Sequence, residues 1–285
     1  VVPAEVTVVA GERVDFKANL FDAKGQFIRT TPIELKLAAM KPGPGLGKDA
    51  IRPVLKGEID GGSFTAPKIS GGQSGSLVAT AGDLEASVRV RQVPTLPYRE
   101  DFESTGAGLV PGGWTNTQLR YVTKELEDGN TVLMKTATIA VPFYRQWYAF
   151  IGTPDMKGYT VSADVMGEKV RDNMPNMGVT AHRYILQMVG NEQKLRVSAW
   201  DAIPRVAKEI DFAWEPDTWY RLKIKVVAED EHSHVLGKAW KKGEAEPSEW
   251  MLDLTDENPN PSGSPGIYGS ALGIQPPKPG TTIYY

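Results

Sequence analysis

Apolar and polar residues alternate over short stretches of this chain, and almost no stretch repeats apolar residues every 3.6 positions. Alternation with a period of two is typical of β-strands that bury one face. In the first third of the chain it predicts strands at residues 5–9, 13–21, 33–37, 76–81 and 86–90. The last two are joined by a turn at Gly82-Asp83. The 29 glycines and 21 prolines interrupt the pattern at short intervals, so we predict an all-β protein.

The rest of the chain continues this pattern after a hairpin signal at Asp128-Gly129-Asn130. The predicted strands are 132–138, 147–151, 159–166, 178–189, 194–200, 219–227, 235–240 and 264–272. So many short antiparallel strands are typical of a two-sheet jelly roll.

The aromatic residues divide the chain into two parts. All seven tryptophans lie beyond residue 113, whereas residues 1–93 contain no Trp or Tyr. A short segment between Pro94 and Pro97 separates the two parts and is stiffened by its prolines. We therefore predict two domains, residues 1–93 and 98–285.

The first domain carries the run Gly62-Ser63-Phe64-Thr65-Ala66-Pro67, followed by a glycine-rich turn and the strand at 76–81. These features resemble the bacterial immunoglobulin-like domains that occur as repeats in surface and secreted proteins. The resemblance covers residues 3–93 and implies an immunoglobulin-like β-sandwich. Phe64 would fill its core, and Pro67 would end a strand because it cannot donate a backbone hydrogen bond.

The second domain opens with Asp101-Phe102-Glu103, has a W-x-x-x-x-W-Y-x-L run at 214–222, and ends near Gly266-Ile267-Tyr268. It resembles the concanavalin A-like lectin/glucanase superfamily. Within that superfamily it is most similar to laminin-G-like modules and to DUF1080-type domains related to 3-keto-disaccharide hydrolases. The resemblance implies a concanavalin A-like jelly roll, and fold similarity alone does not imply an activity.

The pair of domains resembles the C-terminal tail of large secreted planctomycete-type proteins that have an upstream β-propeller of the type that binds pyrroloquinoline quinone. This implies an extracellular, periplasmic or cell-surface location and upstream domains of the same polypeptide as partners. The chain starts at Val1 without an initiator Met or a signal-like leader, which indicates either a processed protein or an excised segment. We expect an excised segment, because the chain stops at a strand-like run at 281–285 with no closing turn.

Composition excludes several classes of function. Lys and Arg number 32 against 35 Asp and Glu, and no basic stripe recurs, so we expect no nucleic-acid partner. The apolar runs are far shorter than the ~20 residues that cross a bilayer, so we expect no membrane insertion. The absence of cysteine excludes disulfides, thiolate metal sites and a cysteine nucleophile.

Catalytic motifs are weak. A retaining glycosidase needs two carboxylates close together, and the only similar run is Glu58-Ile59-Asp60, which has no second glutamate. The run at 72–76 lacks the last glycine of G-x-S-x-G. His232 and His234 lie in a polar run that is typical of a hairpin loop rather than a metal site. We therefore assign no catalytic residue.

Calcium is the one cofactor that the resemblance suggests, because laminin-G-like and lectin relatives often hold it at the rim of the sandwich. The oxygen ligands would come from Asp101, Glu103 and Asp164. No D-x-D-x-D-G loop occurs, and Asp164 could instead pair with an arginine across the sheet. We expect no other cofactor.

A sugar-binding face needs aromatic rings among polar side chains on one side of a strand. Trp200 shares a strand face with Arg196 and Ser198, opposite Leu195, Val197 and Ala199, and Trp240 likewise shares one with Lys238. We expect Trp214 and Trp219 to fill the core or cap its ends. The predicted ligand-binding residues are Trp200, Trp147 and Tyr148 for stacking, with Arg183, His182 and Gln187 as hydrogen-bonding groups.

We therefore predict a non-catalytic carbohydrate-binding or adhesive accessory region with a polysaccharide or glycan as its partner. Two alternatives stay open. One is a glycoside-cleaving enzyme of the 3-keto-disaccharide hydrolase type, which would need two or more carboxylates beside His182 or Arg183. The other is a structural spacer, in which the concave sheet would be flat, filled or covered.

Overall fold

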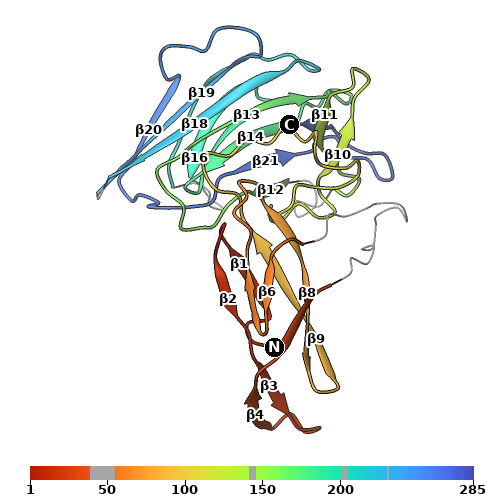
Figure 1. Cartoon of the computed structure of the whole chain (residues 1–285). Helices are drawn as coiled ribbons and strands as arrows, with labels where there is room; N and C mark the ends of the chain where they lie inside the picture. Colours follow the sequence, from red (N-terminus) through yellow and green to blue (C-terminus); the bar gives the residue numbers. More distant parts are fainter. Residues whose placement is uncertain (39–54, 141–145, 200–204, 230) are drawn as a thin grey trace. The chain divides into compact units, whose positions relative to one another are not determined.

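The computed structural model describes residues 1–38, 55–140, 146–199, 205–229 and 231–285. Within these ranges every regular element is a β-strand, which confirms the predicted all-β class (Figure 1). The chain forms two compact units, Val1–Trp114 and Thr115–Tyr285. None of the described residues forms a helix that is long and apolar enough to cross a membrane.

The first unit contains three small sheets. The four-stranded sheet has the order β1 (Glu5–Val8), β9 (Leu84–Gln92), β8 (Gln73–Ala81) and β5 (Glu34–Leu37). The three-stranded sheet has the order β2 (Arg13–Asp15), β7 (Ser63–Thr65) and β6 (Glu58–Asp60), and the two-stranded sheet pairs β3 (Ala18–Phe21) with β4 (Phe27–Thr31). The turn between β8 and β9 lies at Gly82-Asp83, as the sequence predicts, with Ala81 opposite Leu84.

The core of the first unit surrounds Phe64, which is fully buried as predicted. The predicted strand at 13–21 is divided into β2 and β3, because the chain changes partners between them. The Phe16 amide donates to the Gly62 carbonyl, and Lys17 pairs instead with Val2. Alternation alone could not reveal this change, since both pieces keep the same period.

The second unit contains two larger sheets. The seven-stranded sheet has the order β10 (Val122–Glu125), β11 (Thr131–Lys135), β22 (Ile283–Tyr284), β13 (Thr160–Gly167), β18 (Tyr220–Ala228), β19 (Ser233–Lys241) and β20 (Leu252–Asp256). The six-stranded sheet has the order β12 (Gln146–Phe150), β21 (Gly266–Ser270), β14 (Asn176–Ala181), β15 (Tyr184–Val189), β16 (Lys194–Ala199) and β17 (Ala207–Asp211). The predicted hairpin at Asp128-Gly129-Asn130 joins β10 to β11.

These two sheets face each other across an apolar core. Leu222, Ile224 and Val226 of β18 point inward and are at most 4% exposed, as their alternation predicts. Gly237 of β19 lies against Leu186 of β15 and Val197 of β16. Glycine at this position therefore lets the seven-stranded and six-stranded sheets approach closely.

We expect Gly237→Ala to destabilise the second unit by about 1–3 kcal/mol, the usual cost of overpacking a core. A Cβ atom there would lie 2.7 Å from Leu186 Cδ1 and 3.0 Å from Val197 Cγ2. Denaturant unfolding would measure the loss. Gly71→Ala is the control, because a Cβ at Gly71 meets no atom within 4 Å. Equal stability of the two variants would contradict this account of the packing.

The predicted strand at 178–189 is also divided in two. β14 and β15 form a hairpin with Ala181 opposite Tyr184, joined by His182 and Arg183. Both turn residues have positive φ angles, 49° and 64°. Such two-residue turns usually contain glycine or asparagine, so the sequence carries no turn signal at this point.

Candidate binding surface on the seven-stranded sheet

The outward side of the seven-stranded sheet carries tryptophans among charged side chains. Alternation along β18 turns Leu222 and Ile224 into the core, so Arg221 and Lys223 point outward. Register then adds Asp164 on β13 and Trp240 on β19, each directly opposite Arg221, and Lys238 opposite Lys223. We call this the tryptophan–lysine face. Its members are Asp164, Trp219, Arg221, Lys223, Lys238, Trp240, Lys242, Glu246 and Trp250.

One ion-pair group on this face centres on Asp164. The Arg221 guanidinium donates from Nε to Asp164 Oδ1 at 2.5 Å and from Nη2 to Oδ2 at 2.9 Å. Lys242 Nζ lies 3.0 Å from Oδ2. Burial acts to raise the pKa of Asp164, but the hydrogen bonds and positive charges of Arg221 and Lys242 outweigh it and lower the pKa. Asp164 is therefore ionised at neutral pH.

A second ion-pair group centres on Glu246, in the segment between β19 and β20. Glu246 Oε1 accepts from Lys223 Nζ at 2.8 Å and lies 2.7 Å from Lys238 Nζ. Lys238 also donates to the Pro247 carbonyl at 2.7 Å. Hydrogen bonds from Lys223 and Lys238 lower the pKa of Glu246 to about 2. These contacts hold the β19–β20 segment against the sheet.

The tryptophan rings lie beside these groups. Lys238 Nζ is 4.7 Å from the ring centroid of Trp250, and Lys242 Nζ is 5.2 Å from that of Trp219. Both distances allow a cation–π interaction. Trp219 and Trp250 are partly exposed, whereas Trp240 is 8% exposed. The face therefore offers two accessible rings among fixed hydrogen-bonding groups.

Chemically, this arrangement suits binding better than catalysis. A glycosidase needs one carboxyl group whose pKa is raised so that it can donate a proton. Both carboxylates on the tryptophan–lysine face have lowered pKa values and each is shared by two cations. They can accept hydrogen bonds from hydroxyl groups, but they are not placed to act as a general acid.

The structure brings only some of the sequence-predicted ligand residues together. Tyr148 and Gln187 lie in one cross-strand row of the six-stranded sheet, separated by Tyr268 and Gly178. Trp147 is the neighbour of Tyr148 on β12, so its side chain points to the opposite face. The Arg120 guanidinium carbon lies 3.6 Å from the centroid of the Trp147 ring. Trp200 lies outside the described residues.

The six-stranded face that carries Tyr148 and Gln187 offers little accessible surface. Tyr268 is 6% exposed, and Ile185 and Val189 on either side of Gln187 are 3% exposed each. Tyr148 itself packs against Tyr268 with ring centroids 4.9 Å apart. The rings of this row therefore pack on one another, and only Tyr148 and Gln187 are partly exposed.

The other two predicted ligand residues, His182 and Arg183, form the β14–β15 turn. His182 is 1% exposed, so its ring cannot contact a ligand without local rearrangement, whereas Arg183 is exposed. Tyr184, the next residue, donates from its hydroxyl to Asp256 Oδ2 at 2.6 Å. Asp256 is fully buried and also accepts from Arg205 at 2.5 Å.

The predicted calcium ligands do not form one group within a unit. Asp101 and Glu103 belong to the first unit, where the Glu103 amide donates to Asp101 Oδ1 at 3.3 Å. Asp164 belongs to the second unit and pairs with Arg221 and Lys242. Among the described residues, no group of three or more His, Asp or Glu side chains is arranged to hold a metal ion.

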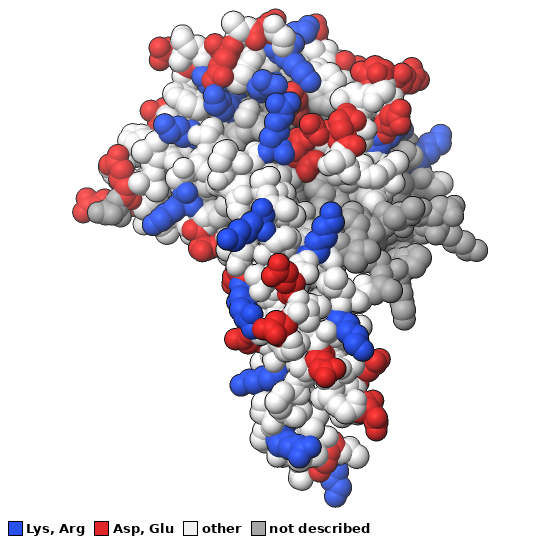
Figure 2. Space-filling model, viewed as in Figure 1, with Lys and Arg blue, Asp and Glu red and all other residues white. Residues whose placement is uncertain are grey.

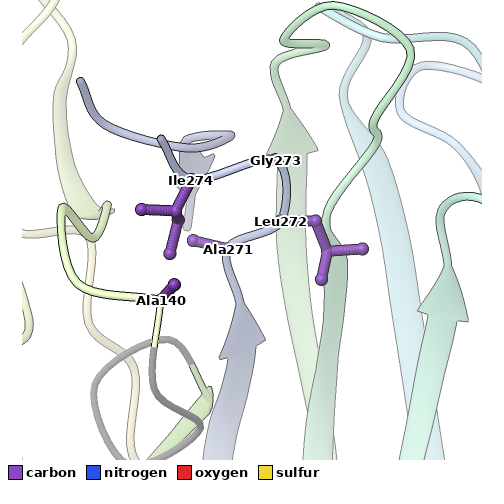
Figure 3. A pocket seen from close by; sticks show the side chains of 5 residues that line it. All are labelled: Ala140, Ala271, Leu272, Gly273 and Ile274. Carbon is purple, nitrogen blue, oxygen red and sulfur yellow. The ribbon is translucent and has the colours of Figure 1, made fainter. Parts of the chain in front are cut away.

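A small pocket of about 150 Å³ lies beside the end of β21 (Figure 3). Its lining consists of Ala140, Ala271, Leu272, Gly273 and Ile274. None of these side chains can hydrogen-bond, so the pocket does not suit a sugar, whose hydroxyl groups need donors and acceptors.

In the view of Figure 2, blue and red side chains are interspersed, without a broad area of one sign.

Sequence reasoning missed most of the tryptophan–lysine face, although a signal was present. The period-two run Arg221, Lys223 and Lys225 lies between the apolar residues that were predicted to point inward. Trp214 is buried as predicted. Trp219 is only partly buried and lies just before β18 on the same side as Arg221, so it does not fill the space between the two sheets.

Comparison with protein-family models gave no match, and comparison with curated proteins gave none. Among solved structures, the chain is similar to the catalytic domain of a GH131 beta-glucanase from Podospora anserina. The TM-score is 0.33 and the sequence identity is 9%, over 62% of this chain and 79% of that chain. A similarity at this level does not identify an activity.

Proposed function

We propose that the second unit is a non-catalytic glycan-binding module that holds a saccharide chain on the tryptophan–lysine face. The observation that carries this proposal is the position of Trp219 and Trp250. Both rings are partly exposed on the outward side of the sheet, beside the ammonium groups of Lys238 and Lys242. Sugar rings stack on aromatic rings through their C–H faces, while their hydroxyl groups need hydrogen-bonding partners.

The ion pairs support this role because they fix the polar groups before a ligand arrives. Arg221 is held by two hydrogen bonds to Asp164, and Lys238 is held by Glu246 and the Pro247 carbonyl. Groups that are already ordered lose little conformational entropy when a saccharide binds. The lowered pKa values of Asp164 and Glu246 favour binding over acid catalysis.

The proposal predicts that Trp219→Ala and Trp250→Ala each weaken polysaccharide binding at least about tenfold, or about 1.4 kcal/mol. The probes are soluble β-glucan, xylan, galactomannan and polygalacturonate, tested by affinity electrophoresis and calorimetry with the whole chain. The control variant is Tyr148→Ala, which removes a ring from the six-stranded face. Far-UV circular dichroism checks that each variant is folded.

The result would go against the proposal if none of the four polysaccharides bound. It would also go against it if Tyr148→Ala abolished binding while both tryptophan variants bound normally. Release of reducing sugar from a probe would favour the glycoside-cleaving alternative and contradict the non-catalytic role.

A further inference from the structure

The β14–β15 turn is held to a distant segment of the chain by a buried tyrosine. The His182 amide donates to the Tyr159 hydroxyl at 3.1 Å, and that hydroxyl donates to the Gly263 carbonyl. Gly263 also packs closely against the turn, since a Cβ atom at this position would lie 2.8 Å from His182 Cα. We call this three-residue arrangement the His182 contact.

The imidazole ring of His182 is buried, and hydrogen bonds do little to offset the cost of removing its nitrogens from water. His182 is 1% exposed, and among the described residues neither ring nitrogen forms a hydrogen bond of good geometry, although the Asn260 backbone lies close enough to act on the ring. Its ring centroid lies 5.1 Å from that of Tyr159. Burial lowers the pKa of His182, and the nearby Asn260 backbone opposes this effect only in part.

The charged groups around the ring do not favour its protonation. The next residue, Arg183, is a cation, and Arg205 reaches the same end of the sandwich by pairing with Asp256. Asp256 is already engaged with Arg205, the Tyr184 hydroxyl and the Asn258 amide. In contrast, His232 and His234 pair with the carboxylates Glu229 and Asp253.

We propose that the His182 contact is an acid-sensitive closure. Protonation of the buried ring releases the β14–β15 turn from residues 257–263. A charged imidazole without an anion is costly to bury, so the ring moves to solvent. The turn is suited to such a change because its two non-glycine residues hold left-handed backbone angles of 49° and 64°.

Release of the turn also loosens the polar cluster behind it. The Asn260 amide donates to the Tyr184 hydroxyl at 3.1 Å, and the Asn258 amide donates to Asp256 Oδ1 at 3.0 Å. Movement of residues 257–263 therefore exposes Tyr184 and Asp256, which are fully buried in the closed state. This inference is independent of glycan binding.

NMR of the whole chain tests this closure in two ways. Titration should place the pKa of His182 below the ordinary histidine value of 6.5. Amide exchange, corrected for its intrinsic pH dependence, should show that protection of Gly263 falls at least about tenfold between pH 7.5 and 5. The Gly263 amide donates to the Met156 carbonyl in the closed state. Protection of Val93, in the first unit, should not change.

The matched variant is His182→Asn, because asparagine tolerates the left-handed backbone and stays neutral. Its Gly263 amide should keep the same protection at both pH values. The closure is refuted if the pKa of His182 is at or above the ordinary histidine value of 6.5. It is also refuted if Gly263 protection stays constant while His182 becomes charged. Both measurements can be made on the unmodified protein if the variant does not fold.

Discussion

Replacing Lys135 with methionine is expected to stabilise the second unit at pH 7 by about 1–3 kcal/mol, since a buried charge without a partner costs more than an apolar side chain. Lys135 is fully buried, and among the described residues its Nζ has no hydrogen-bond acceptor. Its Nζ lies 5.3 Å from the ring centroid of Tyr121. Burial, assisted by the positive charge of Arg120, lowers the pKa of Lys135 to about 8.

The pH dependence gives a sharper test of this prediction. Between pH 8 and 10 the unfolded chain binds more protons at Lys135 than the folded chain, so stability rises with pH in this window. At higher pH, Tyr121 and Tyr285 reverse the trend, because burial raises the pKa of both hydroxyls. Below pH 8 Lys135 is charged in the folded protein, so the full cost of burying its charge lowers the stability.

Urea unfolding at several pH values measures this effect. The Lys135→Met variant should lack the increase between pH 8 and 10. Lys225→Met, on the exposed side of β18, should change the stability by less than about 0.5 kcal/mol. If Lys135→Met lost stability at pH 7, or if its stability changed with pH as in the unmodified protein, other groups in the folded protein would have to stabilise the charged ammonium group.

Removal of the Asp256 carboxylate is expected to lower the free energy of unfolding by about 3 kcal/mol. This is the lower end of the range for a broken buried ion pair, because the Arg205 side chain is one-third exposed. Asp256→Ala leaves the buried Tyr184 hydroxyl without its acceptor and takes the carboxylate from Arg205. Asp253→Ala is the matched control on the same strand. Asp253 is exposed, and its carboxylate lies 3.2 Å from His234 Nδ1; its bond with Lys208 uses the backbone carbonyl, which the alanine variant keeps.

The sign of the pH effect at Asp256 is opposite to that at Lys135. Burial acts to raise the pKa of Asp256, but bonds from Tyr184, Asn258 and Arg205 outweigh it and lower the pKa below the ordinary 3.8. Its stabilising contribution is therefore present above pH 4 and is lost as the pH falls through the lower folded value. If unfolding of Asp256→Ala at pH 7 matched that of Asp253→Ala, the cluster would not be a stabilising element.

Alternation predicted much of the fold because each buried strand face leaves a regular trace in the sequence. The same rule fixes the tryptophan–lysine face, since the side chains between Leu222, Ile224 and Val226 must point outward. Alternation along β18 thus also predicts that Arg221 and Lys223 point outward. Tyr148 and Gln187, in contrast, share a face only through the register of β12, β21, β14 and β15, which alternation does not predict.

Other features depend on contacts between segments that are distant in sequence. Trp250 reaches Lys238 only because Glu246 and Pro247 hold the β19–β20 segment against the sheet. The turn at His182 and Arg183 lacks glycine and asparagine, and it is held by Tyr159 and Gly263 instead. Local propensity cannot predict an element that tertiary contacts impose.

Hydroxyl-radical footprinting tests most directly whether a saccharide chain binds to the tryptophan–lysine face. The whole chain is oxidised with and without a saturating amount of whichever probe polysaccharide binds, and each aromatic residue is quantified by mass spectrometry. The proposal predicts severalfold protection of Trp219 and Trp250, with Trp147 and Tyr148 unchanged. Protection of Tyr148 with none at Trp219 and Trp250 would place the saccharide on the other sheet and contradict the proposal.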